Sequence, residues 1–170
     1  MRERRRTEAL THIDDSGRAR MVNVGAKGET DRFARARAVV AMRPETLARV
    51  RDGGIQKGDV LAVAQVAGIM AAKRTSDLVP LCHPITLSGV EVRFDFPDAS
   101  SIGVEASVHT TARTGVEMEA LTAVMAAALA VYDMCKAMDR DMAVTFAGLM
   151  EKSGGSSGHY RRGSNGEGRA

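Results

Sequence analysis

The sequence predicts an α+β fold of the ferredoxin-like type, a sandwich in which helices pack on one face of an antiparallel sheet. Strand-like and helix-like segments follow one another in the order β-α-β-β-α-β, which is the order of that sandwich. A length of 170 residues, with 44% hydrophobic and 26% charged residues, fits one domain with its own core. We therefore expect a single domain over residues 10–158, between a disordered arm at 1–9 and a flexible tail at 159–170.

The first half of the predicted fold starts with a strand, after an irregular stretch that ends near residue 34. Arginine and alanine alternate over residues 35–42 and give way to valine, a pattern typical of a strand. Pro44 then marks the first turn of a short helix, and the glycines at 53–54 mark its end. A longer helix is predicted over residues 57–73, because apolar residues recur there at helical spacing and form one face.

A β-hairpin, a long helix and a last strand form the second half. Residues 86–96 and 102–111 have strand character, and the connection between them is rich in Pro, Asp and Ser. Residues 116–138 form a helix that is apolar nearly all round, so we expect burial on several sides. The last strand is predicted at 142–149, before a glycine- and serine-rich tail from Ser153. The long helix is too apolar for one small sheet to cover, which predicts that part of it contacts another subunit.

Composition and charge disfavour several classes of function. The chain has no Trp, two Tyr and four Phe, which leaves little aromatic surface for stacking on single-stranded nucleic acid. The net charge of +3 favours anionic partners only mildly, and the basic residues form no stripe that would fit duplex DNA. Two cysteines make no disulfide framework. With no signal-like segment and no uninterrupted apolar run long enough to span a bilayer, we expect a cytoplasmic protein without a membrane partner.

The segment Pro80-Leu81-Cys82-His83-Pro84 holds a histidine between two prolines. Proline disfavours the helical conformation of the residue before it, so Val79 and His83 should both be extended and the loop stiff. A stiff loop that aims an imidazole suits proton transfer, although a histidine that is hydrogen-bonded for structure alone fits the same pattern. Zinc binding by Cys82, His83, Cys135 and His159 is disfavoured, because the usual ligand spacing is missing.

Charged side chains stand at both ends of the long helix. Asp133 and Lys136 share one face of it, and the apolar turns before them predict partial burial, which would favour the neutral amine. An ordinary ion pair fits the spacing equally well. Glu117 and Glu119, at the other end, fit simple compensation of the positive helix end. Glu119 and Asp133 are about 21 Å apart along the helix at about 1.5 Å per residue, so one pocket can hold both only if it is long or combines opposite ends of two subunits.

Single basic residues along the chain suit a polyphosphate better than a duplex. Lys152 precedes the run Ser153-Gly154-Gly155-Ser156-Ser157-Gly158, whose flexible backbone could wrap phosphate oxygens. This run is not a Walker loop, because the lysine precedes the glycines and no strand-loop-helix follows. A solvated linker fits the composition as well. The basic residues singled out here are Lys27, Arg32, Lys57, Lys73, Arg74 and Lys152.

Seven of these stretches, taken together and in order, resemble the cyclic pyranopterin monophosphate synthases, the family of molybdenum cofactor biosynthesis protein C. The resemblance covers nearly the whole chain, from about Leu10 to Gly158. Gly25 stands where the family often has serine, and Ala112 where it often has glycine. The stretches are Met21-Val22-Asn23-Val24-Gly25-Ala26-Lys27, Lys57-Gly58-Asp59-Val60, Ala71-Ala72-Lys73-Arg74-Thr75, Leu78-Val79-Pro80-Leu81-Cys82-His83-Pro84, Thr114-Gly115-Val116-Glu117-Met118-Glu119-Ala120-Leu121, Tyr132-Asp133-Met134-Cys135-Lys136-Ala137 and Lys152-Ser153-Gly154-Gly155.

The resemblance implies a homohexamer, a trimer of dimers with active sites at the dimer interfaces. It implies conversion of 3′,8-cyclo-7,8-dihydroguanosine 5′-triphosphate, made by an upstream radical cyclase, to cyclic pyranopterin monophosphate and pyrophosphate, with no metal or organic cofactor. Lys57 and Lys136 correspond to the main acid/base pair, with Asp133 as an active-site carboxylate and His83 beside them. The positions that correspond to substrate contacts are Leu81, Cys82, His83, Met118 and Glu119, with Lys27, Arg32 and Lys152 at the triphosphate and Lys73 and Glu117 as further candidates.

Two other classes of function stay open from the residues alone. One is a non-catalytic nucleotide-binding or regulatory module of the same fold, which would tolerate loss of Lys57 and Lys136 with only weaker binding. The other is a zinc-dependent hydrolase, which would lose activity when metal is removed. A synthase that opens a purine ring and closes a cyclic phosphate needs repeated proton transfer, and lysine, aspartate and histidine side chains can supply it.

Overall fold

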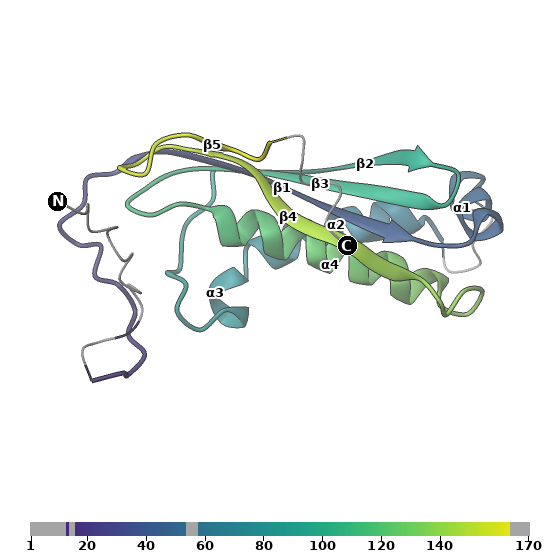
Figure 1. Cartoon of the computed structure of the whole chain (residues 1–170), viewed down its shortest axis with the longest axis horizontal. Coiled ribbons are helices and arrows are strands. Elements are labelled where there is room, and N and C mark those ends of the chain that lie inside the picture. The colour runs from purple at the N-terminus through teal and green to yellow at the C-terminus, as the bar shows by residue number, and fades with distance from the viewer. Residues whose placement is uncertain (1–12, 14–15, 54–57, 164–170) are drawn as a thin grey trace, which may run out of the picture.

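The computed structural model describes Ile13, residues 16–53 and residues 58–163. A five-stranded antiparallel sheet carries its helices on one face (Figure 1), which confirms the predicted α+β, ferredoxin-like sandwich. The strands are β1 (Thr30–Ala41), β2 (Gly89–Asp98), β3 (Ser101–Ala112), β4 (Ala143–Ser153) and β5 (Tyr160–Arg161), in the spatial order β2-β3-β1-β4-β5. The helices are α1 (Pro44–Arg51), α2 (Val60–Ala72), α3 (Thr75–Leu78) and α4 (Glu117–Cys135).

The central strand β1 alternates small apolar side chains with arginines. Ala34, Ala36 and Ala38 are fully buried toward the helices, and their small side chains leave room for α4, which packs across β1 and β3. On the opposite face, Arg35 pairs with a carboxylate of β4 and Arg37 with one of β2. The alternation therefore separates an apolar layer from a charged open face.

Strand β1 begins earlier than the sequence pattern predicts. It starts at Thr30, which pairs with Ala112 at the end of β3, rather than near residue 35. The first residues of β1 are polar on both faces and exposed, so no apolar alternation marks them. Backbone pairing with β3, and not side-chain burial, forms this end of the strand.

Helices α2 and α4 lie side by side and run in opposite directions (Figure 1). The side chain of Asp59 caps α2 by accepting the N–H groups of Leu61 and Ala62, each at 3.0 Å. A Cβ on Gly68 would lie only 3.0 Å from the main-chain oxygen of Ala123 in α4. Glycine at this position therefore allows the two helices to pack closely, and the end of α2 reaches the start of α4.

Helix α4 is the main core helix, but one face of it is open. Ala123, Ala127 and Val131 are fully buried, as the apolar pattern predicts, whereas Met125 and Leu129 are 37% and 60% exposed. By length and composition alone, the 19 residues of α4 are apolar enough to cross a membrane. The sequence expectation counts only the apolar run inside this helix and therefore underestimates its apolar length. Core helices of globular proteins can have the same length and composition. Helix α4 packs against three strands of the sheet, β1, β3 and β4, as a core helix does.

Residues 150–162 form more regular structure than their glycine and serine content predicts. Strand β4 continues to Ser153, which pairs with Phe33 of β1, and β5 adds two residues to the edge of β4. Arg162 fixes this edge, because its main-chain N–H donates to Met150 O at 2.8 Å and its Nε donates to Leu149 O at 2.9 Å. The sequence pattern predicts neither β5 nor the short helix α3.

Candidate active site

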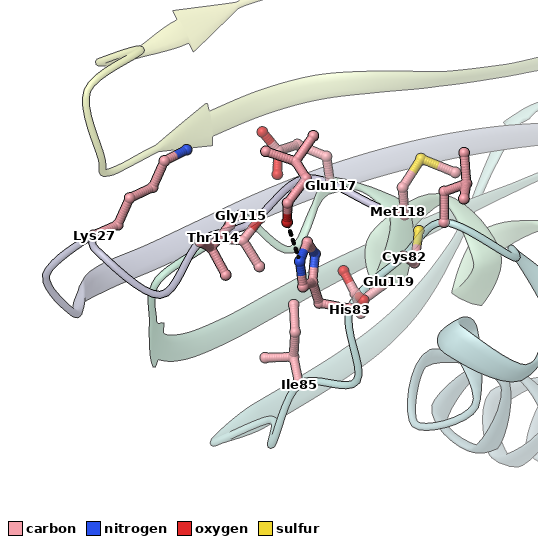
Figure 2. A pocket seen from close by; sticks show the side chains of 12 residues that line it. Lys27, Cys82, His83, Ile85, Thr114, Gly115, Glu117, Met118 and Glu119 are labelled. Atoms are coloured by element: carbon pink, nitrogen blue, oxygen red, sulfur yellow. Dashed lines mark hydrogen bonds between the residues drawn. The ribbon is translucent and has the colours of Figure 1, made fainter. Parts of the chain in front are cut away.

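A pocket of about 360 Å³ opens at the end of the helix layer where α4 begins (Figure 2). Three segments far apart in the sequence form it: a strap at residues 22–27, the loop at 81–85 and the first turn of α4 with the residues just before it. Seven predicted site residues line it, namely Lys27, Leu81, Cys82, His83, Glu117, Met118 and Glu119. The structure thus brings together most of the substrate-binding candidates, including those that the sequence separates by more than 90 positions.

The loop that carries His83 is held by its own backbone. Val79 is extended, with φ −114° and ψ 102°, which confirms the effect expected of the following proline. The N–H of Cys82 donates to Val79 O at 3.0 Å and closes a turn, and the buried hydroxyl of Thr75 donates to Ala72 O at 3.0 Å. The first contact closes a turn directly before His83, and the second joins the start of α3 to the end of α2.

His83 lies between the strap and the start of α4 (Figure 2). Its Nε2 is 2.7 Å from the main-chain oxygen of Val22, and the side chain is half-buried. The strap is closed on itself by two short-range hydrogen bonds, from Gly25 N to Asn23 Oδ1 at 2.8 Å and from Lys27 N to Val24 O at 3.0 Å. The imidazole therefore ties the strap to the loop at the centre of the pocket.

A buried carboxyl group lines the pocket beside this loop. Glu119 is only 4% exposed. Burial raises the pKa of the Glu119 carboxyl, its own backbone N–H opposes that shift, and the nearby charge of Glu117 adds to the rise. Burial likewise raises the pKa of the Cys82 thiol, and the charge of Glu119 raises it further. This part of the pocket therefore favours groups that donate hydrogen bonds or carry positive charge.

Positive charge and glycine-rich backbone lie beside the pocket, at Arg32, Lys152 and residues 154–155, which we call the rim. Lys152 Nζ is 3.3 Å from a carboxylate oxygen of Glu117 and also contacts the hydroxyl of Ser157. Arg32 Nε donates to Ala112 O at 3.2 Å. The backbone next to these cations has left-handed conformations at Gly154 (φ 98°) and Gly155 (φ 73°), which favour glycine. A Cβ on Gly155 would overlap the guanidinium of Arg32, so this glycine also makes room for the arginine.

Asp133 and Lys136 lie at the other end of α4 and do not line this pocket. Lys136 Nζ is 2.5 Å from Asp133 Oδ1, and their side chains are 52% and 61% exposed. The expected partial burial of this pair is therefore wrong for the single chain, because the pair lies on the open face of α4, where Leu129, one turn before Asp133, is 60% exposed as well. Lys57 lies outside the described residues.

Two further predictions concern Lys73 and zinc. Lys73 lines a separate hollow of about 440 Å³ beside β2, which shares Ile85 with the candidate site. Of the zinc alternative, Cys135 is fully buried near the far end of α4 and His159 pairs with Glu151 at 2.9 Å, so these two do not join Cys82. Over residues 16–53 and 58–163, no three His, Cys, Asp or Glu side chains gather as a metal site.

Sequence reasoning missed part of the pocket wall. Val22, Val24, Ile85 and Thr114 line it, although three of them fall within the stretches that carry the family resemblance. The main-chain oxygen of Val22 is the most informative of these groups, since it bonds the candidate catalytic histidine. A carbonyl oxygen has no side-chain signature, so only the folded chain reveals its role.

Comparison with known proteins identifies the family of the chain. The model of the MoaC family matches residues 21–155. A protein of Brevibacillus brevis is 55% identical over 157 residues, which is 92% of this chain and 98% of that protein. A protein of Heliobacterium modesticaldum is 60% identical over 156 residues (91% and 98%), and one of Roseiflexus sp. is 59% identical over 153 residues (89% and 96%).

All three relatives bear the name cyclic pyranopterin monophosphate synthase. The match covers the strap, the histidine loop and the start of α4, which line the pocket, and it extends to Gly155 beside them. The chain therefore belongs to the MoaC family, and it is an enzyme of the cyclic pyranopterin monophosphate synthase type.

Proposed function

We propose that this enzyme converts 3′,8-cyclo-7,8-dihydroguanosine 5′-triphosphate to cyclic pyranopterin monophosphate and pyrophosphate, an early step of molybdenum cofactor biosynthesis. The names of the relatives support the product. The observation that carries the proposal is one pocket that combines a buried carboxyl group and a tethered imidazole with lysines at its rim. Such a pocket suits a ligand with a hydrogen-bonding ring at one end and phosphates at the other.

The buried carboxyl of Glu119 is our candidate for recognition of the guanine-derived ring. That ring presents N–H donors on its pyrimidine edge, and a carboxylate can accept two parallel hydrogen bonds from such an edge. Burial holds the pKa of the Glu119 carboxyl above its usual value in the empty pocket, so bound donors would favour its ionised form. The apolar side chains of Leu81 and Met118 in the same pocket supply surface for the ring.

The cations at the rim are our candidates for the triphosphate. Lys27 lines the pocket, and Lys152 is joined to it through Glu117 at 3.3 Å. Arg32 lies against the glycine-rich backbone at 154–155. When a hydroxyl attacks the α-phosphorus and pyrophosphate leaves, negative charge grows on the departing oxygens, and fixed positive charge stabilises that change. We infer that phosphate competes with Glu117 for Lys152.

A second copy of the chain would supply the groups that this pocket lacks. The exposed face of α4 runs from Met118 through Met125 and Leu129 to Asp133, because residues spaced by three, four or seven share one helix face. If two α4 helices pack antiparallel about a two-fold axis beside Met125, Met118 of one copy lies opposite Asp133 of the other. Asp133 and Lys136 of the second copy then approach the pocket that contains His83.

In this dimeric site we assign the main acid/base roles to Lys57 and Lys136, with Asp133 and His83 as their partners. The exposed ion pair between Asp133 and Lys136 would lose solvent on pairing of the copies, which strengthens its electrostatic effects. A trimer of such dimers is the larger assembly that the family resemblance implies. Lys73, beside the neighbouring hollow, is a further candidate for phosphate contact.

The direct test is to incubate the purified enzyme with the cyclised nucleotide and to measure pyrophosphate and the pterin product together. The proposal predicts both products in equal amounts. Lys136→Met should abolish pyrophosphate release at saturating substrate, because it removes a proton donor or acceptor rather than a binding contact alone. A non-catalytic binding module would instead show no product with the unmodified enzyme, and a metal-dependent enzyme would lose activity after chelation.

A further inference from the structure

We propose that His83 exchanges protons with the substrate through Nδ1, and that the main-chain carbonyl of Val22 is the positioning group that makes it do so. This inference rests on the proposed function, since it assigns a role within the same site. The observation behind it is the distance of 2.7 Å between His83 Nε2 and Val22 O, at the centre of the pocket (Figure 2).

The identity of the protonated nitrogen follows from the acceptor. A carbonyl oxygen carries no hydrogen, so in this hydrogen bond the ring nitrogen must be the donor. A neutral imidazole has a single N–H, and placing it at Nε2 leaves Nδ1 as the unprotonated nitrogen with a free lone pair. Nε2 is occupied by the strap, and Nδ1 is therefore the only ring position that can take a proton from a substrate O–H or N–H.

The same hydrogen bond stays in place when the ring becomes charged. A proton that moves from the substrate to Nδ1 gives an imidazolium in which both nitrogens are donors, and Nε2–H still points at Val22 O. The carbonyl dipole stabilises that positive charge, and the ring can return the proton in a later step without turning. The ring orientation is thus fixed over the whole proton cycle, as it is for histidines that a carboxylate or carbonyl holds in one tautomer.

The Val22 carbonyl also couples the histidine to the rim of the pocket. Lys27 follows five residues later on the same strap, which is tightened by the bond from Lys27 N to Val24 O. Arg113 donates to Gly25 O at 3.3 Å and holds the strap from the side of β3. Loss of the bond to Val22 should therefore loosen Lys27 as well, and so weaken phosphate binding.

Two substitutions separate the roles of the two ring nitrogens. In His83→Gln the side-chain amide nitrogen can reach the position of Nε2 and donate to Val22 O, but it cannot accept and return a proton. In His83→Asn the amide can reach only the position of Nδ1, and the bond to Val22 is lost. His109→Gln, on the exposed surface of β3, is the matched control and should keep full activity.

We expect His83→Gln to keep KM close to that of the unmodified enzyme while kcat falls by roughly 10²–10⁴-fold, the usual loss on removal of a general acid or base. His83→Asn should lose kcat to a similar degree and also show a raised KM. Near-normal kcat in His83→Gln would overturn the proposal, because the bond to Val22 would then suffice and Nδ1 would have no part.

Nitrogen-15 NMR of the substrate-free enzyme tests the tautomer independently of turnover. With the ring neutral, Nε2 of His83 should give the shift of a protonated nitrogen and Nδ1 that of an unprotonated one; the reverse assignment would overturn the proposal. If the unmodified enzyme formed no pterin product, the proposed function would fail while the NMR result still stood. The two failures are therefore distinguishable.

Discussion

The two ends of helix α4 both carry charged side chains, but these are buried at one end and exposed at the other. At its start, Glu119 is 4% exposed and lines a formed pocket. At its end, Lys136 and Asp133 are 52% and 61% exposed and lie outside that pocket. The first end can bind and orient a ligand, and the second presents proton-transfer groups on an open face. Each end therefore supplies what the other lacks, which is the strongest reason to expect a site built from two copies.

The largest effect should come from breaking the face that joins these two ends. Leu129→Asp places a charge in the exposed apolar stripe of α4, where the side chain is 60% exposed in a single chain, so the subunit itself should still fold. We expect dissociation of the assembly in light scattering and loss of nearly all pyrophosphate release. Phe96→Asp, at an exposed apolar position of β2, is the control. A fully assembled and active Leu129→Asp variant would contradict the two-copy site.

The next largest effect should be on triphosphate affinity, when charged residues at the rim of the pocket are replaced. Lys152→Met removes a cation that we assign to the triphosphate, and a charge-assisted hydrogen bond of about 1.5–3 kcal/mol corresponds to a roughly 10–150-fold weaker apparent affinity. Glu117→Gln should instead strengthen the apparent affinity for the triphosphate, because it frees Lys152 from its 3.3 Å ion pair. Titration calorimetry with a triphosphate nucleotide measures both. Equal affinities in the two variants would show that Lys152 does not contact phosphate.

The buried carboxyl should show a conflict between stability and function. The pKa of Glu119 is raised in the folded state by burial, so its ionisation opposes folding. Stability should therefore fall as pH rises from the unfolded carboxyl value of about 4.3 through the raised folded value, and the full penalty applies above that value. Glu119→Gln should remove this penalty and raise Tm at neutral pH in the absence of substrate, while product formation falls. A Tm difference that is independent of pH would contradict this account.

The smallest effect on the enzyme should come from Asp139, which fixes the loop that follows α4. Asp139 is 2% exposed and accepts hydrogen bonds from Arg43 N at 2.8 Å and Thr46 Oγ1 at 3.3 Å, which join the loop after α4 to the start of α1. The bond from the N–H of Arg43 is the main reason that the pKa of Asp139 is lowered. Asp139→Ala should cost about 1.5–3 kcal/mol of unfolding free energy at neutral pH.

The difference in unfolding free energy between the unmodified enzyme and Asp139→Ala should depend on pH. Because the folded pKa of Asp139 is depressed, its contribution is fully present above the unfolded value of about 3.9 and is lost as pH falls through the folded value. Denaturant unfolding at pH 7 and pH 3 measures it. An unchanged stability gap at the lower pH would mean that packing, and not the carboxylate, supports the loop.

The sequence predicts the architecture well where side-chain pattern and burial coincide. The alternation in β2 and β3 and the apolar face of α2 all mark real elements, because burial of one face selects those residues. The pattern fails where backbone pairing alone forms an element, as at Thr30 and in β5. Local hydrophobicity also gives the wrong burial for the pair Asp133 and Lys136. The exposure of the pair depends on which face of the helix points away from the sheet, and neighbouring apolar residues do not show this.

The candidate site divides in the same way. Motif reasoning finds His83, Glu119 and Lys27, whose side chains carry the chemistry, and the structure brings them to one pocket. It cannot find the oxygen of Val22, which any residue at that position would present. It also cannot decide whether Lys136 of a second copy reaches the pocket, since that depends on packing between chains and not on the fold of one.

Complementation between two inactive variants tests the two-copy site most directly. His83→Ala removes a group from the pocket end, and Lys136→Met removes one from the far end of α4. When the two chains are co-expressed and allowed to assemble at random, we expect about a quarter of the activity of the unmodified enzyme, since half of the dimers are mixed and one of their two sites is intact. If the mixture stays as inactive as each variant alone, both groups act within one chain and the two-copy site is wrong.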